Sequence, residues 1–134
     1  MEILVAARDV RVRRALSGLL ELVDHRTVSS ADTAGLGPRL DAAVADALVV
    51  LEVDRGHETQ DLQVIGRLAD RGCSVIGVCS GVTSSSAVLA AGAKVCLDKD
   101  DAGFADRLAE TVRTMSGRAA PGGRPQRSGC RPDR

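Results

Sequence analysis

Charged and sulfur-bearing side chains stand at the ends of short apolar runs in this sequence. Glu52 closes one such run, Arg8 and Asp9 follow another, and Cys79 and Lys99 end or follow two more. A carboxylate beside a cation can form an ion pair, carboxylates together can hold a hard divalent cation, and neighbouring thiols can be oxidised. The spacing therefore predicts a charged site along one edge of the fold, where these runs end.

The elements that must position these side chains follow from hydrophobic spacing. Val- and Ile-rich runs alternate with longer segments of helical periodicity, which is typical of a parallel sheet covered on both faces. The predicted strands are 2–7, 25–30, 47–53, 74–79 and 94–97. The predicted helices are 10–22, 31–45, about 62–70 after a polar loop at 54–59, 87–91 and 102–115. In the first helix we expect Arg11, Arg13 and Arg14 to face water mostly.

Five such alternating units match a flavodoxin-like winding. We therefore expect one doubly wound α/β domain with a five-stranded parallel sheet in the order 2-1-3-4-5 and about five helices. In this topology the functional crevice lies beyond the carboxyl ends of the strands. That edge is where the charged and thiol side chains are expected.

Length and composition allow one compact domain. The 134 residues are 44% hydrophobic but only 1% aromatic, with Phe104 as the lone aromatic residue, so base-stacking platforms are not expected. The formal net charge is +0, with five arginines in the Gly-, Pro- and Arg-rich segment 117–134, which we expect to be disordered. The folded domain, 1–116, is then mildly acidic, which disfavours nucleic-acid binding except weakly through the tail.

The cysteines and the apolar runs indicate the cellular compartment in which the protein is expected. Cys73, Cys79, Cys96 and Cys130 lack the close paired spacing of zinc sites, and no signal-like segment precedes the first strand. No apolar run approaches the roughly 20 residues needed to span a bilayer. We expect a reduced, cytoplasmic protein without a membrane partner.

Four segments resemble the receiver domain of response regulators, the CheY-like family, over about residues 1–116. They are the opening strand EILVAA at 2–7, the strand DALVVLE at 46–52, VIGV at 75–78 and AGAKVCLDK at 91–99. The resemblance implies that Glu52 stands where the family keeps its phosphate-accepting aspartate. It also implies that Lys99 is the family's terminal lysine, which could here reach Glu52.

The resemblance also shows where this sequence departs from the family. Ala7 and Arg8 stand where the metal-binding acidic pair belongs, which leaves only Asp9 nearby. Ala7 offers no ligand and Arg8 repels a cation, so magnesium binding is expected to be weak or absent, with no other cofactor. Arg8 could instead pair with Glu52. The sequence thus resembles a pseudo-receiver that lacks both the acceptor aspartate and the acidic pair.

The two switch positions of the family carry cysteines. Cys79 replaces the Thr or Ser that ends the fourth strand, and Cys96 replaces the aromatic residue; Ser80 could supply a substitute hydroxyl. Since the fourth and fifth strands should be neighbours, Cys79 and Cys96 could come close enough for oxidation. Two small buried thiols that only fill apolar space are the alternative.

The resemblance implies a stand-alone, non-enzymatic protein-interaction module in signal transduction that works without phosphorylation. Its partner, a regulator or a kinase, is expected at the face formed by the fourth helix, fifth strand and fifth helix, and a homodimer is left open. Glu52 then either imitates the phosphorylated state or is a tolerated acid. Two alternatives stay open: a phosphorelay receiver that uses Asp54 or Asp9, and a small-ligand or redox sensor. His25 and His57 are expected to be surface residues.

Overall fold

The computed structural model of the chain describes residues 3–23, 28–35, 47–80 and 85–117. Its five strands are β1 (Ile3–Ala6), β2 (Val28–Ala31), β3 (Leu48–Glu52), β4 (Ser74–Cys79) and β5 (Val95–Asp98). All pair in parallel and form one sheet in the order β2-β1-β3-β4-β5. The predicted flavodoxin-like, CheY-like fold is confirmed.

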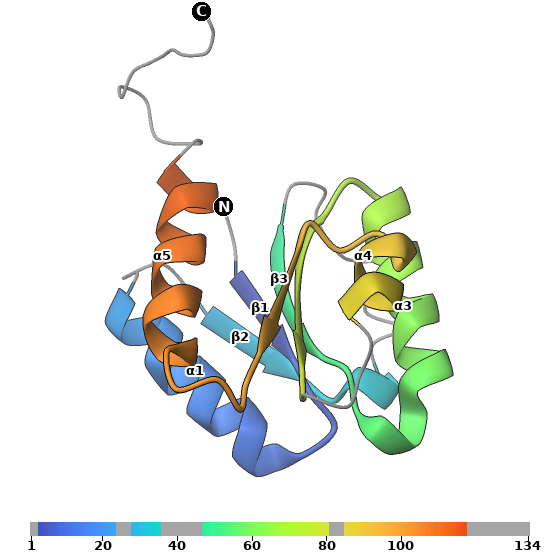
Figure 1. Cartoon of the computed structure of the whole chain (residues 1–134), viewed down its shortest axis with the longest axis horizontal. Coiled ribbons are helices and arrows are strands. Elements are labelled where there is room, and N and C mark those ends of the chain that lie inside the picture. Colours follow the sequence, from blue (N-terminus) through green and yellow to red (C-terminus); the bar gives the residue numbers. More distant parts are fainter. Residues whose placement is uncertain (1–2, 24–27, 36–46, 81–84, 118–134) are drawn as a thin grey trace, which may run out of the picture.

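Helices cover both faces of this sheet. The described residues form four α-helices, α1 (Val10–Val23), α3 (Glu58–Asp70), α4 (Ser85–Ala91) and α5 (Phe104–Gly117), and two short 3-10 helices, η1 (Thr33–Gly35) and η2 (Arg55–His57). Figure 1 shows α1 and α5 on one side of the sheet and α3 and α4 on the other. Every residue of β3 is buried, as expected of a central strand with helices on both faces.

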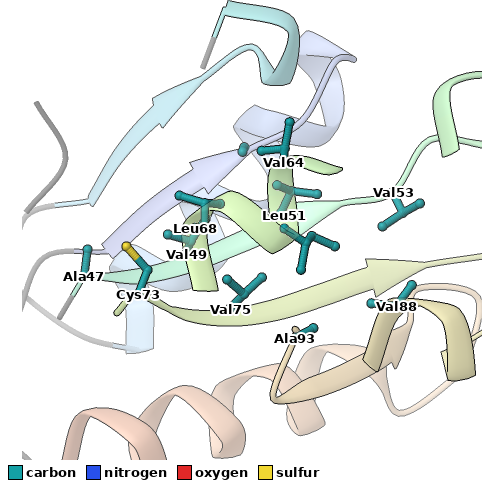
Figure 2. Packing of buried hydrophobic residues seen from close by; sticks show 12 residues of the cluster. Ala47, Val49, Leu51, Val53, Val64, Leu68, Cys73, Val75, Val88 and Ala93 are labelled. Atoms are coloured by element: carbon teal, nitrogen blue, oxygen red, sulfur yellow. The ribbon is translucent and has the colours of Figure 1, made fainter. Parts of the chain in front are cut away.

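Two aliphatic clusters hold the layers together. One contains buried side chains of β1, β3 and β4 with α1, β5 and α5, among them Leu20, Ile76 and Leu108. The other packs β3 and β4 against α3 and α4, and Figure 2 shows its members, such as Leu51, Leu68 and Val75, lying against one another. Both clusters are built from aliphatic side chains and cysteine, and Phe104, the single aromatic residue, packs partly buried against the first cluster.

A glycine lets α4 come close to the sheet. A methyl group added at Gly77 in β4 would lie 2.4 Å from Val88 Cγ1, a separation that carbon atoms do not tolerate. Val88 is fully buried. The absent side chain at Gly77 therefore provides the space in which Val88 anchors α4.

The structure changes several predicted boundaries. Residue 31 ends β2 instead of beginning a helix, and 33–35 form η1. The remainder of the predicted helix, 36–45, and 25–27 of the predicted strand lie outside the described residues. The predicted polar loop at 54–59 contains η2 and the first turn of α3, which begins at 58. The last helix extends to 117, and the predicted tail from 118 onward lies outside the described residues.

Candidate functional site

The acid that ends β3 forms an ion pair with the lysine that follows β5. Glu52 is only 4% exposed, and its Oε2 accepts a hydrogen bond from Lys99 Nζ. This hydrogen bond is the main reason why the pKa of Lys99 is raised above its ordinary value, so the lysine stays charged. The pairing expected from the sequence is present, because the carboxyl ends of β3 and β5 lie at the same edge of the sheet.

Arg8 has a different partner from the expected one. Its Nε and Nη2 donate to Oδ1 of Asp61 at 3.1 and 2.9 Å, so the pairing of Arg8 with Glu52 is wrong. Asp61 lies in the first turn of α3, is 0% exposed, and its Oδ2 accepts the backbone N–H of Asp54 at 2.8 Å. A carboxylate without exposure is held by charge and hydrogen bonds that replace its water.

Sequence reasoning missed Asp61, although the sequence carries a signal for it. Asp61 precedes the buried residues Val64, Ile65 and Leu68 by three, four and seven positions, which is the spacing of one helix face. An acid on the apolar face of a helix needs a partner of opposite charge or hydrogen-bond donors. Arg8, one residue beyond the buried Ala7, is that partner.

Asp9 and Arg13 form hydrogen bonds with backbone groups of the β1–α1 turn. Ala7 is fully buried, and Asp9 is exposed, with its Oδ1 accepting the backbone N–H of Arg11 at 2.8 Å. That hydrogen bond lowers the pKa of Asp9. Arg11 and Arg14 are exposed, as expected, whereas Arg13 is half-buried and donates to the carbonyl oxygens of Ala7 and Arg8 at 2.8 and 3.3 Å. The Arg13 guanidinium therefore holds the backbone of this turn.

A polar cleft of about 320 Å³ opens beside the Glu52–Lys99 pair. Its lining comprises Glu52, Val53, Asp54, Arg55, Ser80, Lys99 and Asp100. Oδ2 of Asp54 lies 2.7 Å from Nδ1 of His57, and this contact is the main reason why the pKa of Asp54 is lowered. His57 is exposed, as expected, but it belongs to the rim of the site. Among the described residues, the buried Ser80 Oγ has no hydrogen-bond partner.

The donor set at this edge does not suit a magnesium ion. Asp9 uses a carboxylate oxygen for the turn of α1, and Asp61 uses both of its oxygens for Arg8 and Asp54. Within the described ranges, no three His, Cys, Asp or Glu side chains gather in a way that could hold a metal.

The two switch-position cysteines lie in contact on β4 and β5. Their Sγ atoms are 3.1 Å apart, and both thiols are free. Cys79 is 3% exposed and Cys96 is partly buried. Burial, with a further contribution from the hydrogen bond to Cys79, raises the pKa of Cys96 to about 12. Neighbouring strands thus bring together two thiols that are 17 residues apart.

A second, more apolar groove of about 380 Å³ lies between β5 and α5. Its lining comprises Val95, Leu97, Arg107, Glu110, Thr111, Thr114 and Met115. It lies on the face that the sequence predicted for a protein partner. In the described residues, no helix has the length and apolar character needed to cross a membrane.

Comparison with solved structures identifies the fold independently. The receiver domain of a DNA-binding response regulator from Colwellia psychrerythraea superposes with a TM-score of 0.71 at 20% identity, over 87% of this chain and 98% of that one. A response regulator receiver protein from Burkholderia phymatum gives 0.66 at 26% identity, over 90% and 98%. A protein described as pilus-assembly-related, from Burkholderia pseudomallei, gives 0.68 at 18% identity, over 90% and 92%. No protein-family model and no curated protein matches the chain.

Proposed function

We propose that this chain, whose fold is that of response-regulator receiver domains, is a signalling module that binds a protein partner without being phosphorylated. The supporting observation is that the charges at the carboxyl edge already neutralise one another. Glu52 has Lys99, and Arg8 has Asp61. A site whose cations and acids are internally paired needs neither a metal ion nor a phosphoryl group to be electrically balanced.

Phosphoryl transfer needs positive charge that is available to the incoming phosphate. A receiver aspartate accepts a phosphoryl group with the help of a magnesium ion, which holds the phosphate oxygens and offsets the developing charge. In this chain Ala7 and Arg8 supply no oxygen ligand, and the Lys99 ammonium is bound to Glu52. We therefore infer that magnesium binds weakly or not at all, and that the chain has no phosphotransfer activity or other enzymatic activity.

The partner surface is proposed on the face formed by α4, β5 and α5. The groove between β5 and α5 has aliphatic walls with Arg107 and Glu110 at its polar side, and Leu89 of α4 is 46% exposed. Aliphatic contacts flanked by charges of both signs suit another folded protein better than a nucleic acid backbone. Lys99 directly follows β5, which connects the charged edge with this face.

The proposal is tested by an amide NMR titration of the isotopically labelled full chain with magnesium and then with beryllofluoride, which imitates a phosphoryl group. We expect the resonances of Ala7, Glu52 and Lys99 to keep their positions throughout. An active receiver domain in the same buffer controls for the reagent. The matched Glu52→Asp variant shows whether the acceptor residue alone prevents binding.

Two results would overturn the proposal. Saturable shifts around Glu52 that spread to Cys79 and Cys96 would show a working phosphoacceptor. Shifts centred on Asp54 that vanish in an Asp54→Asn variant would favour the alternative acceptor, which lines the same cleft. In that variant His57 loses its charged partner, so the fold must first be checked by its unchanged amide spectrum elsewhere.

A further inference from the structure

The sheet register places the two thiols on one face of neighbouring strands. Cys96 lies directly opposite Gly77, and Cys79 lies opposite Asp98. Since successive side chains of a strand alternate between faces, Cys79 and Cys96 point to the same side of the sheet. The residue opposite Cys96 has no side chain, so nothing from that position separates the sulfur atoms, which are 3.1 Å apart.

We propose that Cys79 and Cys96 are a modification site: a dithiol that a hydroperoxide converts into a reversible disulfide between β4 and β5. The bond requires the sulfur atoms to approach by about 1 Å from their present separation. If the two cysteines only fill apolar space, their sulfur atoms need not come closer and both thiols stay reduced.

The reaction proceeds in two balanced steps. One sulfur attacks the peroxide; the O–O bond breaks, the sulfur keeps one oxygen as a sulfenic acid, and the other oxygen leaves as water or an alcohol with the thiol proton. The second sulfur then attacks the sulfenic sulfur; the S–S bond forms, the S–O bond breaks, and the hydroxide leaves as water with the second thiol proton. Two thiols are oxidised by two electrons and one peroxide is reduced. A dithiol reductant reverses the change.

Geometry favours the second step over competing reactions. The resolving sulfur is already in contact with its target, so the step is intramolecular and needs no diffusion. Burial raises the pKa of Cys96, which slows attack by this sulfur on the peroxide in the first step.

The disulfide would act on the charged edge through the backbone. The N–H of Lys99 donates to the carbonyl oxygen of Cys79 at 2.8 Å, and Lys99 follows Cys96 by three residues. A displacement of Cys79 on forming the bond would be passed to Lys99, the partner of Glu52, through this hydrogen bond. This consequence for partner binding rests on the proposed function, whereas the chemistry of the bond does not.

The test uses the full chain with Cys73→Ala and Cys130→Ser, which leaves only Cys79 and Cys96. Cys73 lies at the other end of β4, about 20 Å away along the strand, so its removal does not touch the site. The protein is treated with hydrogen peroxide, alkylated under denaturing conditions and digested with trypsin. We expect a loss of about two mass units, a peptide 72–94 linked to 95–99, and reversal by dithiothreitol.

Two further variants sharpen the result. Cys79→Ala and Cys96→Ala in the same background should each give no linked peptide. Both thiols fully alkylated after oxidation of the parent chain, or links formed only between molecules, would overturn the proposal. Unchanged amide resonances of Lys99 after complete disulfide formation would overturn the coupling to the site. Because neither readout involves magnesium, beryllofluoride or a partner, failure here is distinguishable from failure of the proposed function.

Discussion

Removal of the buried carboxylate at Asp61 tests the central electrostatic argument. Asp61→Asn keeps the shape of the side chain but leaves the Arg8 guanidinium, whose side chain is 19% exposed, without a counter-charge. The asparagine amide also turns an N–H₂ group toward Arg8 or toward the N–H of Asp54, and each of these is a hydrogen-bond donor. The variant should therefore be strongly destabilised.

The magnitude follows from burial. Removing one partner of a buried ion pair costs about 3–5 kcal/mol. Arg8 keeps part of its hydration, and Asn can still accept one hydrogen bond, so we expect a loss of about 2–4 kcal/mol in the free energy of unfolding. Urea unfolding followed by far-UV circular dichroism measures this loss. An unchanged m-value confirms that the same surface is exposed on unfolding.

A double-mutant cycle isolates the ion pair from the hydrogen bond to Asp54. Arg8→Met removes the cation, and the double variant with Asp61→Asn should lose at least about 1 kcal/mol less than the sum of the two single variants. The amide chemical shift of Asp54 in each variant reports whether its hydrogen bond changes equally in both backgrounds, which the cycle requires. A loss below about 1 kcal/mol for Asp61→Asn, or additive losses in the cycle, would refute the view that Asp61 neutralises Arg8.

Three further predictions concern pH and packing. The pKa of Lys99 is raised above 10.5 chiefly by its hydrogen bond to Glu52, so the stabilisation is complete below pH 10.5 and is lost as the pH rises through the folded-state value. Urea titrations should show a steeper alkaline loss in the native chain than in Lys99→Gln; equal slopes would contradict this. Gly77→Ala should lower the free energy of unfolding by about 1–3 kcal/mol, because the added methyl group contacts Val88. Val88→Ala should relieve that contact, so the double variant should lose less in thermal unfolding than the sum of the two single variants. Additive losses would count against this contact. Leu108→Ala should lower the free energy of unfolding, measured in urea, by about 2–5 kcal/mol, because Leu108 is fully buried. A loss of only a few tenths of a kcal/mol would be incompatible with that burial.

The sequence by itself determined the fold and part of the site. Val- and Ile-rich runs alternating with segments of helical period allow few arrangements other than a parallel sheet with helices on both faces. Once that sheet is given, Glu52 and Lys99 must lie at its carboxyl edge and Cys79 and Cys96 on adjacent strands. These placements depend on the order of the strands and on the alternation of successive side chains between the two faces of a strand, and both can be inferred from the sequence pattern.

Only the tertiary structure decided which acid pairs with Arg8. From the sequence, Arg8 had an acid at Glu52 directly across the edge, whereas Asp61 was one more polar residue near the start of a helix. The packing of α3 buries Asp61 completely and brings it to Arg8, and Glu52 is left to Lys99. Asp61 and Glu52 are both buried, so each carboxylate must have a partner. Helical spacing indicates that Asp61 faces the core, but which cation it meets there depends on how α3 packs on the sheet. The 3.1 Å contact of the two thiols was likewise decided by the register of β4 and β5, which places Cys96 opposite Gly77 and Cys79 opposite Asp98.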